Sequence, residues 1–535
     1  MSKSKKKINK KALNQSINQD DDSLKDSASA QFHYDAFVTD TIAEEILDID
    51  RYLGEYNQSA TKNFISSTQL SLILSIVILF AAFCMLKPDL AITAFLICGS
   101  TLHLSLTIIK SLVFNLKEKV RSLRQSYIEA IKSVKEEIQY NSDEFPIYSI
   151  LLPVLTEDKQ VLEQLFEAIY NLNYPKDKLQ ILLLVEEIDS KTINYVKQIE
   201  SNLNYQLIII PDFQPRTKAK ACNYALNFVK GEYVVIFDAD DIPSPDQLMI
   251  AIERFKIQKD NGKLACLQAK LNYYNADENL LTRLFSLEYA VLFDKILPSL
   301  SRGCYPLPLG GTSNHLRADV LKQLKGWDIY NLAEDAEIGI RLAINGYKTE
   351  TIDSHTAEES PVTIWAWIKQ RSRWLKGFIQ TYLLYLQRCN NLTDKIGAKK
   401  SFISMHFMIG LSTLSLIVTP FMIAFGGLLI SGYTSIDNET NDFILGFSGV
   451  SAGLWIMSTI YQSVKTIKSS NFLKAFSPIK KIILILAFPP YFILHTVAAL
   501  YAVFDLIRRP FYWSKTKHGI TKSKVSIKKL FNKNS

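Results

Sequence analysis

Five long stretches without a charged residue divide the chain and predict transmembrane helices. They are Phe64–Leu86, Leu90–Ile109, Phe402–Ile430, Phe443–Ser463 and Ile482–Phe504. A helix needs roughly 20 apolar residues to cross a bilayer, and each stretch is about that long. Buried helices of a soluble protein would rarely give five such stretches. The pair Pro489-Pro490 interrupts the last one, which favours a re-entrant hairpin over a single span.

The long polar region between the second and third stretches alternates strand-like and helix-like segments. The expected strands are Tyr148–Val154, Gln180–Val185, Gln206–Ile210 and Tyr233–Phe237. The expected helices are Lys159–Asn171, Lys191–Asn202 and Ala219–Lys230. Such alternation with short loops predicts a parallel α/β sheet. Ligands of these sheets bind beyond the carboxyl ends of the strands.

Acidic residues follow three of the expected strands. In chain order they are Glu157-Asp158, Glu186-Glu187 and Asp238-Ala-Asp240. A single acidic strand end would be an ordinary solvated turn. Three acidic ends at one edge of a sheet indicate a ligand that brings a cation or many hydroxyl groups.

Basic residues are concentrated beside the apolar stretches. The formal net charge is +8, the first eleven residues hold six lysines, and Arg508–Ser535 holds nine Lys or Arg and no acid. The positive-inside bias predicts a multi-pass plasma-membrane protein whose N-terminus, polar region and tail are cytoplasmic. The basic flanks indicate contact with membrane lipids and not with nucleic acid. Residues 1–30 are expected to be disordered, and Thr41–Tyr56 to form a short amphipathic helix.

The pair Asp238 and Asp240 suits a divalent cation that holds a diphosphate. Mg²⁺ and Mn²⁺ prefer oxygen ligands, and Mg²⁺ usually binds through one or two carboxylates plus substrate phosphates. Lys218, in the segment Pro215–Asn223, is a candidate for phosphate or sugar contact. A solvated turn and an ordinary helix start are the alternatives for these two segments.

Two further segments carry groups suited to a sugar substrate. Leu309–His315 reads LGGTSNH, and its members Gly311, Thr312, Ser313 and Asn314 would bind hydroxyl groups unless they form only a capped turn. Glu334 and Asp335 precede a helix, where acids are often just partners of the helix dipole. An inverting sugar transfer needs a base that deprotonates the acceptor hydroxyl, and Asp335 is the candidate for it.

The segment WAWIKQRSRWLKGF predicts an amphipathic helix at the membrane interface. Its tryptophans fit that role as a group. Gln370, Arg373 and Trp374 are spaced i, i+3 and i+4 and therefore share one face. Arg373 would hold a pyrophosphate, and Trp374 would stack on an acceptor sugar.

Taken in order, these motifs resemble those of the family 2 glycosyltransferases with a GT-A fold. Within that family the chain is similar to the membrane-embedded branch that includes cellulose, hyaluronan and poly-N-acetylglucosamine synthases. The blocks Pro215–Leu226, Gly310–His315, Glu334–Leu342 and Gln370–Gly377 carry the resemblance, which covers roughly residues 147–385.

The resemblance implies a role for each motif. Asp238 would position the nucleotide sugar and share the metal with Asp240, and Asp335 would be the general base beside Glu334. Gln370, Arg373 and Trp374 would line the acceptor and diphosphate site. Glu186 and Glu187 stand where many members have Asp-Asp for the nucleoside, so the acid that contacts the base or ribose stays open. Tail residues Trp513, Thr516 and His518 faintly resemble a gating segment, W-x-x-T-x-K, of such synthases.

We therefore expect a Rossmann-like GT-A domain, of the nucleotide-diphospho-sugar transferase type, joined to an α-helical transmembrane bundle. The expected parts are a polar N-terminus (1–60), a transmembrane hairpin (63–113), the GT-A domain (146–360), interfacial helices with QxxRW (361–400), a transmembrane region (402–506) and a basic tail (507–535).

The expected activity is metal-dependent, inverting hexosyl transfer from a nucleotide sugar, with UDP as the expected carrier, to a growing β-linked polysaccharide. Two alternatives stay open: a non-processive transferase that adds one sugar to a lipid-linked glycan, and an inactive membrane scaffold. The presence of Asp238, Asp240 and Asp335 argues against the scaffold.

Overall fold

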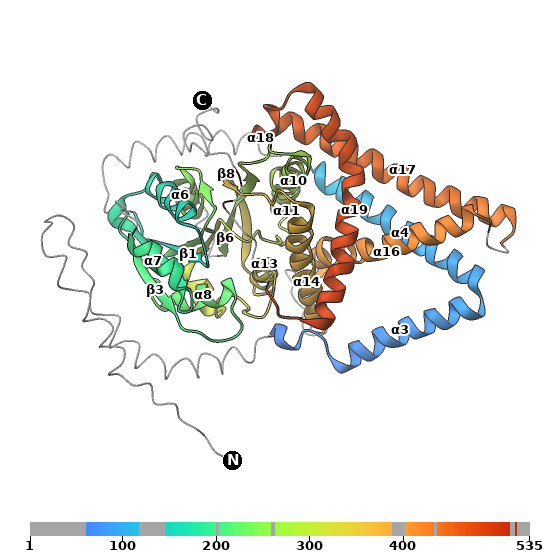
Figure 1. Cartoon of the computed structure of the whole chain (residues 1–535), viewed down its shortest axis with the longest axis horizontal. Helices are drawn as coiled ribbons and strands as arrows, with labels where there is room; N and C mark the ends of the chain where they lie inside the picture. The colour runs from blue at the N-terminus through green and yellow to red at the C-terminus, as the bar shows by residue number, and fades with distance from the viewer. Residues whose placement is uncertain are drawn as a thin grey trace, which may run out of the picture. The chain divides into compact units, whose positions relative to one another are not determined.

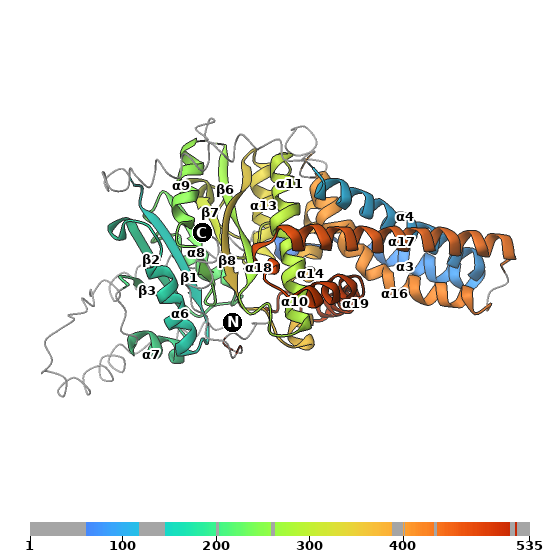
Figure 2. The same cartoon turned by 90° about the horizontal axis from the view of Figure 1, so that it is seen from above.

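A computed structural model describes residues 60–116, 145–198, 203–257, 263–387, 400, 402–432, 436–513, 519 and 521. It has an α/β domain from which long apolar helices extend (Figures 1 and 2). The predictions for residues 1–59, including the amphipathic helix Thr41–Tyr56, and for Thr516 and His518 lie outside these residues.

The α/β domain is built on an eight-stranded sheet with the order β3-β2-β1-β4-β7-β6-β8-β5. The strands are β1 (Tyr148–Val154), β2 (Leu179–Glu186), β3 (Gln206–Ile210), β4 (Tyr233–Ile236), β5 (Ile242–Pro243), β6 (Leu264–Tyr273), β7 (Asn314–Arg317) and β8 (Lys348–Glu358). The helices of this domain are α6 (Lys159–Tyr170), α7 (Ser190–Gln198), α8 (Lys218–Ala225), α9 (Gln247–Ile257), α10 (Leu280–Val291), α11 (Leu297–Arg302), α12 (Ala318–Gln323) and α13 (Glu334–Ile344).

The four predicted strands are confirmed and pair in parallel with one another, but the strands that follow them make the sheet as a whole mixed. β1 pairs in parallel with β2 and β4, and β2 pairs in parallel with β3. β7 runs antiparallel to its neighbours β4 and β6. The reason is that β7 follows a loop at the carboxyl edge of the sheet, where Ser313 N donates to Ile236 O (2.9 Å) at the end of β4. A strand that starts where its neighbour ends must run in the opposite direction.

The central strands are apolar because helices cover them on both faces. In β1, which reads YSILLPV, six of the seven residues are buried. Leu152 and Leu162, from β1 and α6, belong to one hydrophobic core that also includes Leu183 of β2 and Phe237. This packing fixes the strand ends that carry the acidic residues.

Five helices among the described residues are long and apolar enough to cross a membrane. They contain α3 (Ser67–Leu86), α4 (Pro88–Phe114), α16 (Leu411–Ile430), α17 (Asn438–Ser469) and α19 (Pro478–Arg508). α3, α4, α16 and α17 extend away from the α/β domain (Figures 1 and 2). Serine pairs join α4 to α17, with Ser100 Oγ 2.9 Å from Ser448 Oγ and Ser111 Oγ 2.7 Å from Ser458 Oγ.

α19 corrects the hairpin predicted at Pro489-Pro490, because the chain forms one continuous helix there. Proline is tolerated in apolar helices where neighbouring helices and local adjustment satisfy the freed backbone groups. Both ends of α19 nevertheless lie against the α/β side of the molecule. Lys480 Nζ is 2.7 Å from Asp277 Oδ2 near its start, and Asp505 near its end pairs with Lys376 of α14 at 2.5 Å. α19 therefore crosses the bases of the other four helices (Figure 1).

α14 (Ile364–Gln387) carries the QxxRW motif and joins the two parts of the molecule. Trp367, at its start, is fully buried, whereas Trp365 is half exposed. The same helix contacts α19 through Lys376 and α10 through Arg371, which pairs with Glu288 at 2.7 Å. The motif is thus held by buried polar contacts on both sides. After α14 the chain continues through the π-helical turn η6 (Met405–Gly410) into α16.

Candidate active site

A cavity of about 290 Å³ lies at the carboxyl ends of the central strands. Its walls come from the ends of β1, β2 and β8, the loops after β4 and before β7, the starts of α8 and α13, and α14. It is lined by most of the residues predicted for the site: Glu186, Lys218, Asp238, Asp240, Gly311, Thr312, Glu334, Asp335, Gln370, Arg373 and Trp374. Motifs up to 188 positions apart in the sequence, from Glu186 to Trp374, therefore share one cavity.

Lys218 links three of these segments. It is the first residue of α8, whose N-cap Thr217 accepts a hydrogen bond from Lys220 N. The Lys218 ammonium contacts the Asp238 carboxylate and donates to Gly311 O (2.7 Å). Burial is the largest influence on Lys218 and lowers its pKa, but Asp238, Cys222 and Glu334 together outweigh burial and raise the pKa above the ordinary range. The cavity thus contains a permanent cation beside its acids.

Asp238 and Asp240 offer carboxylate oxygens to the cavity. Asp240 Oδ2 accepts a hydrogen bond from Glu359 N at 2.8 Å. The described residues include no group of three or more His, Cys, Asp or Glu side chains placed to bind a metal by themselves. Two carboxylates at one strand end fit a divalent cation whose remaining ligands are diphosphate oxygens and water.

Two further carboxyl groups lie close to this pair, those of the buried Asp241 and the partly buried Glu358. Asp241 accepts hydrogen bonds from Asp238 N (2.6 Å) and from the Thr312 hydroxyl, and its Oδ1 has no hydrogen-bond partner among the described residues. The Oε1 atom of Glu358, the last residue of β8, is likewise buried without a hydrogen-bond partner among the described residues. Burial, and then repulsion from Asp238 and Asp240, raises the pKa of Asp241 well above its ordinary value. Burial and then Asp241 do the same to the pKa of Glu358.

Glu334 and Asp335 form the first turn of α13 at another wall of the cavity. Asp335 Oδ1 accepts from Ala336 N (2.7 Å), and a Cβ added at Gly311 would lie 3.4 Å from Asp335 Oδ2. Burial and then the neighbouring Glu334 raise the pKa of Asp335 to about 7. Burial also raises the pKa of Glu334, although Lys218 opposes this shift. A carboxyl group with a pKa near 7 is matched to proton transfer at neutral pH.

Gln370, Arg373 and Trp374 all line the cavity, as their shared helix face predicts. Gln370 Oε1 and Arg373 Nε are buried without a hydrogen-bond partner among the described residues. Burial lowers the pKa of Arg373, while Glu334 and Asp335 oppose this shift. The Arg373 guanidinium lies 5.7 Å from the ring centre of Trp513, which also lines the cavity. Two residues of the cavity wall therefore each contain a buried polar atom without a hydrogen-bond partner among the described residues.

The cavity has one polar and one apolar end. Glu186, at the end of β2, pairs with the buried Lys220 (2.7 Å) and lies at the polar end with Arg216. Phe378 of α14 and Met408 and Ile409 of η6 line the end toward the apolar helices.

Three residues of the predicted set do not line the cavity. Glu187 is exposed, and its Oε2 accepts from Asp212 N (3.3 Å). Ser313 is buried behind the wall, with its Oγ 2.6 Å from Thr356 Oγ1. Asn314 Nδ2 donates to Gly310 O (2.6 Å) and so shapes the glycine loop from behind.

Sequence reasoning missed Glu358 and Glu359, both of which line the cavity. Their signal was an acid pair that ends a strand, as in the three segments that were recognised. Glu359 also fixes the tail, because its Oε1 accepts from Thr521 N (2.7 Å) and its Oε2 from Gly519 N (2.5 Å). With Trp513 in the wall, the segment after α19 contributes directly to the cavity.

The fold and the cavity define a class of protein: a transferase built to bind a nucleotide sugar. Two family models match the chain, "Glycosyl transferase family 2" over residues 149–299 and "Glycosyl transferase family group 2" over residues 233–430. The chain belongs to the family 2 glycosyltransferases, and its α/β domain has the GT-A fold of that family.

Relatives with assigned names support the same family. "Probable glycosyltransferase YdaM" of Bacillus subtilis (strain 168) is 26% identical over 322 residues, which cover 59% of this chain and 72% of that protein. "Glucomannan 4-beta-mannosyltransferase 2" of Arabidopsis thaliana is 28% identical over 263 residues, 46% of this chain and 46% of the relative. Among solved structures, the mannosyltransferase PcManGT from Pyrobaculum calidifontis, in complex with GDP-Man and Mn²⁺, is 16% identical with a TM-score of 0.44. That match covers 77% of this chain and 99% of PcManGT.

Proposed function

We propose that the protein transfers a hexose, with inversion, from a nucleotide diphosphate sugar to a growing β-linked polysaccharide at the membrane. The observation that carries the proposal is the partly buried Asp335 carboxyl, which lines one cavity together with Asp238, Asp240 and Arg373. In this proposal the base, the diphosphate site and the cations that balance its charge share this cavity. UDP is the expected carrier.

Each of these residues has its own role in the proposed reaction. Asp335 accepts the proton of the acceptor hydroxyl as its oxygen bonds to the anomeric carbon of the donor sugar. The bond between that carbon and the diphosphate oxygen breaks, and the nucleoside diphosphate leaves with the electron pair. Lys218 and Arg373 stabilise the charge that develops on it, because preorganised cations in a water-poor site act strongly on such charge. Mg²⁺ or Mn²⁺ held by Asp238 and Asp240 would supply Lewis-acid stabilisation of the same group.

The acceptor side supports a polymer or another glycan that approaches from the membrane. Trp374 offers an aromatic face to a sugar, and Phe378, Met408 and Ile409 continue the wall toward the apolar helices. The name of the glucomannan mannosyltransferase relative supports a β-linked polysaccharide as the product class. A lipid-linked glycan that receives a single sugar would use the same apolar end.

The helix arrangement supports a simple topology. α3, α4, α16 and α17 cross the membrane, and α19 lies along its surface next to the α/β domain, so the domain, the N-terminus and the tail share the cytoplasmic side. Both ends of α19 contact that side of the molecule through Lys480 and Asp505. The basic residues of the tail agree with this placement.

The test uses the full chain, purified in native lipid, with a panel of UDP- and GDP-sugars and Mg²⁺ or Mn²⁺. We expect metal-dependent release of nucleoside diphosphate with one donor and a product that grows by many sugars. A product that stops after one added sugar would establish the lipid-linked alternative. No release with any donor, in the presence of lipid extract as acceptor source, would contradict the transferase proposal.

A further inference from the structure

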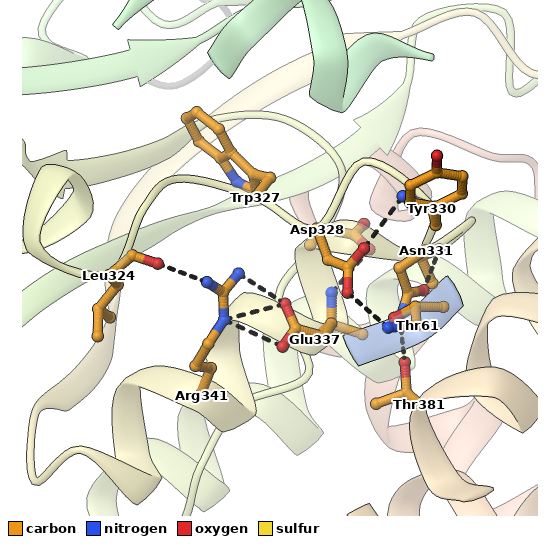
Figure 3. A network of polar contacts seen from close by, with 12 residues as sticks. Thr61, Leu324, Trp327, Asp328, Tyr330, Asn331, Glu337, Arg341 and Thr381 are labelled. Atoms are coloured by element: carbon orange, nitrogen blue, oxygen red, sulfur yellow. Dashed lines mark hydrogen bonds and ion pairs between the residues drawn. The ribbon is translucent and has the colours of Figure 1, made fainter. Parts of the chain in front are cut away.

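A short helical turn before the first apolar helix is bound to the loop that precedes α13. This helix begins with Glu334 and Asp335 and is here called the catalytic helix. The turn is η1 (Ala60–Asn63), and the loop, here called the approach loop, is residues 327–333. Figure 3 shows Thr61 among the polar side chains of this loop, with Thr381 of α14 on the other side. Segments more than 250 positions apart in the sequence therefore meet at one point.

Hydrogen bonds hold this junction together. Thr61 N donates to Asp328 Oδ2 (3.0 Å), and Asn331 Nδ2 donates to Thr61 Oγ1 (3.3 Å) and to Thr381 Oγ1 (2.8 Å). Thr61 and Thr381 are 0% exposed and Asn331 is 1% exposed. Because all three are buried, removal of the Thr61 hydroxyl takes one of the two acceptors from Asn331 Nδ2 in a place that water does not reach, which makes the loss costly.

The same Asn331 side chain fixes the start of the catalytic helix. Its Oδ1 accepts from Ala333 N (2.9 Å), and Ala333 is the N-cap of α13. Ala333 has no side chain that can cap the helix, so Asn331 holds the backbone where Glu334 and Asp335 begin. One turn later, Glu337 pairs with Arg341 (2.8 Å) and accepts from the Tyr385 hydroxyl of α14 (2.7 Å). α13 is thus fixed at its N-cap and again one turn further along the helix.

The arrangement differs from ordinary packing. An apolar contact would join η1 to the domain at less cost, because each buried polar group must find a partner. Here one amide side chain uses its nitrogen to bind the turn before the membrane helix and its oxygen to fix the backbone before Asp335. A displacement of η1 would therefore reach the backbone before Asp335 through Asn331, while Asp328 joins η1 to the same loop.

We propose that Thr61 and Asn331 are positioning residues for Glu334 and Asp335. The entry to the first membrane helix is then part of the catalytic machinery as well as an anchor. This inference rests on the proposed glycosyl transfer, because it assigns a reaction step to Asp335. It implies that loss of the junction lowers turnover and leaves donor binding intact, since the donor contacts at Lys218, Asp238 and Asp240 come from other segments.

The test compares Thr61→Val with Thr61→Ser in the full chain in lipid. Valine keeps the shape of threonine but cannot accept the bond from Asn331, whereas serine can. We expect Thr61→Val to lower kcat roughly tenfold or more, since small misplacement of a catalytic group is costly. Its KM for the donor should stay within about twofold, and Thr61→Ser should restore kcat. Thr363→Val is the matched control, because Thr363 caps α14 at an exposed position where it accepts from Ala366 N (3.3 Å).

Hydrogen exchange of peptides that cover residues 328–340 gives a second readout, independent of activity. We expect faster exchange in Thr61→Val and wild-type exchange in Thr61→Ser and Thr363→Val. Wild-type kcat in Thr61→Val would overturn the inference, as would an equal loss in the serine and valine variants. If the wild-type chain transfers no sugar, the proposed function fails on its own. In that case unchanged exchange in Thr61→Val would overturn the coupling, and faster exchange would support it.

Discussion

Gly377 controls how closely α14 approaches the start of the catalytic helix. A Cβ built on Gly377 would lie 2.4 Å from Ala333 N and 2.6 Å from Ala333 Cβ. Ordinary van der Waals contact begins near 3.4 Å, so Gly377→Ala must push the two segments apart by about 1 Å. Both partners are rigid, because one is a helix interior and the other is backbone. The strain of such overpacking is typically about 1–3 kcal/mol.

The effect on activity should exceed the effect on stability. Ala333 directly precedes Glu334 and Asp335, so a shift of about 1 Å at Ala333 moves the proposed base by a similar amount. A misplacement of this size can cost about 100-fold in rate. We therefore expect Gly377→Ala to remain folded and membrane-inserted, with kcat reduced by about two orders of magnitude and donor binding largely kept.

The assay measures nucleoside diphosphate release per folded molecule, with thermal unfolding in the same lipid. Gly426→Ala is the matched control, because Gly426 is also inside a helix and a Cβ there meets nothing within 4 Å. The reasoning is refuted if Gly377→Ala and Gly426→Ala have equal activity. It is also refuted if the whole loss of activity in Gly377→Ala is explained by unfolded protein.

Three further predictions follow from other contacts. The pKa of Asp335 is about 7, and only its ionised form accepts a proton. In a pH–rate profile, kcat/KM should therefore fall about tenfold per pH unit below about pH 7 and level off above it. Lys376→Met should lower the free energy of unfolding by about 2 kcal/mol and reduce activity. The reason is that the buried Lys376 pairs with Asp505 and donates to Tyr512 O (3.1 Å), next to Trp513 in the cavity wall. Lys376→Arg should retain more of the stability and more of the activity, measured by thermal unfolding and by nucleoside diphosphate release. In a cysteine-free background, Ile479→Cys and Ile507→Cys, at the two ends of α19, should react with a membrane-impermeant thiol reagent from the same side of the bilayer, and Asn438→Cys, at the start of α17, from the opposite side.

Much of the fold could be predicted because its signals are local. β1 and β3 have the predicted bounds, since short apolar runs between turn residues define a buried strand. The antiparallel β7 could not be predicted in the same way, because its direction depends on where the preceding loop crosses the sheet. α19 shows the same limit: its composition indicated a membrane segment, but tertiary contacts of Lys480 and Asp505 determine where its ends lie.

The site residues, like the fold, could be predicted from the sequence only in part. Asp238, Asp335 and Arg373 could be selected because their motifs combine charge with a strand end or a helix face, and all three line the cavity. Ser313 and Asn314 stand in an equally suggestive motif but do not line the cavity, because their side chains are used by Thr356 Oγ1 and Gly310 O. Glu358 had a local signal, an acid pair at a strand end, whereas the contact of Thr61 with the approach loop joins distant segments and has none.

The most direct test of the central claim is nucleoside diphosphate release by the wild-type chain and by Asp335→Asn, with the preferred donor at about pH 8. Asparagine keeps the size of the side chain but cannot take the proton. The account predicts that Asp335→Asn binds the donor normally and releases product about 100- to 10,000-fold more slowly, the range expected for loss of a general base. Release at the wild-type rate by Asp335→Asn would contradict the assignment of Asp335 as the base.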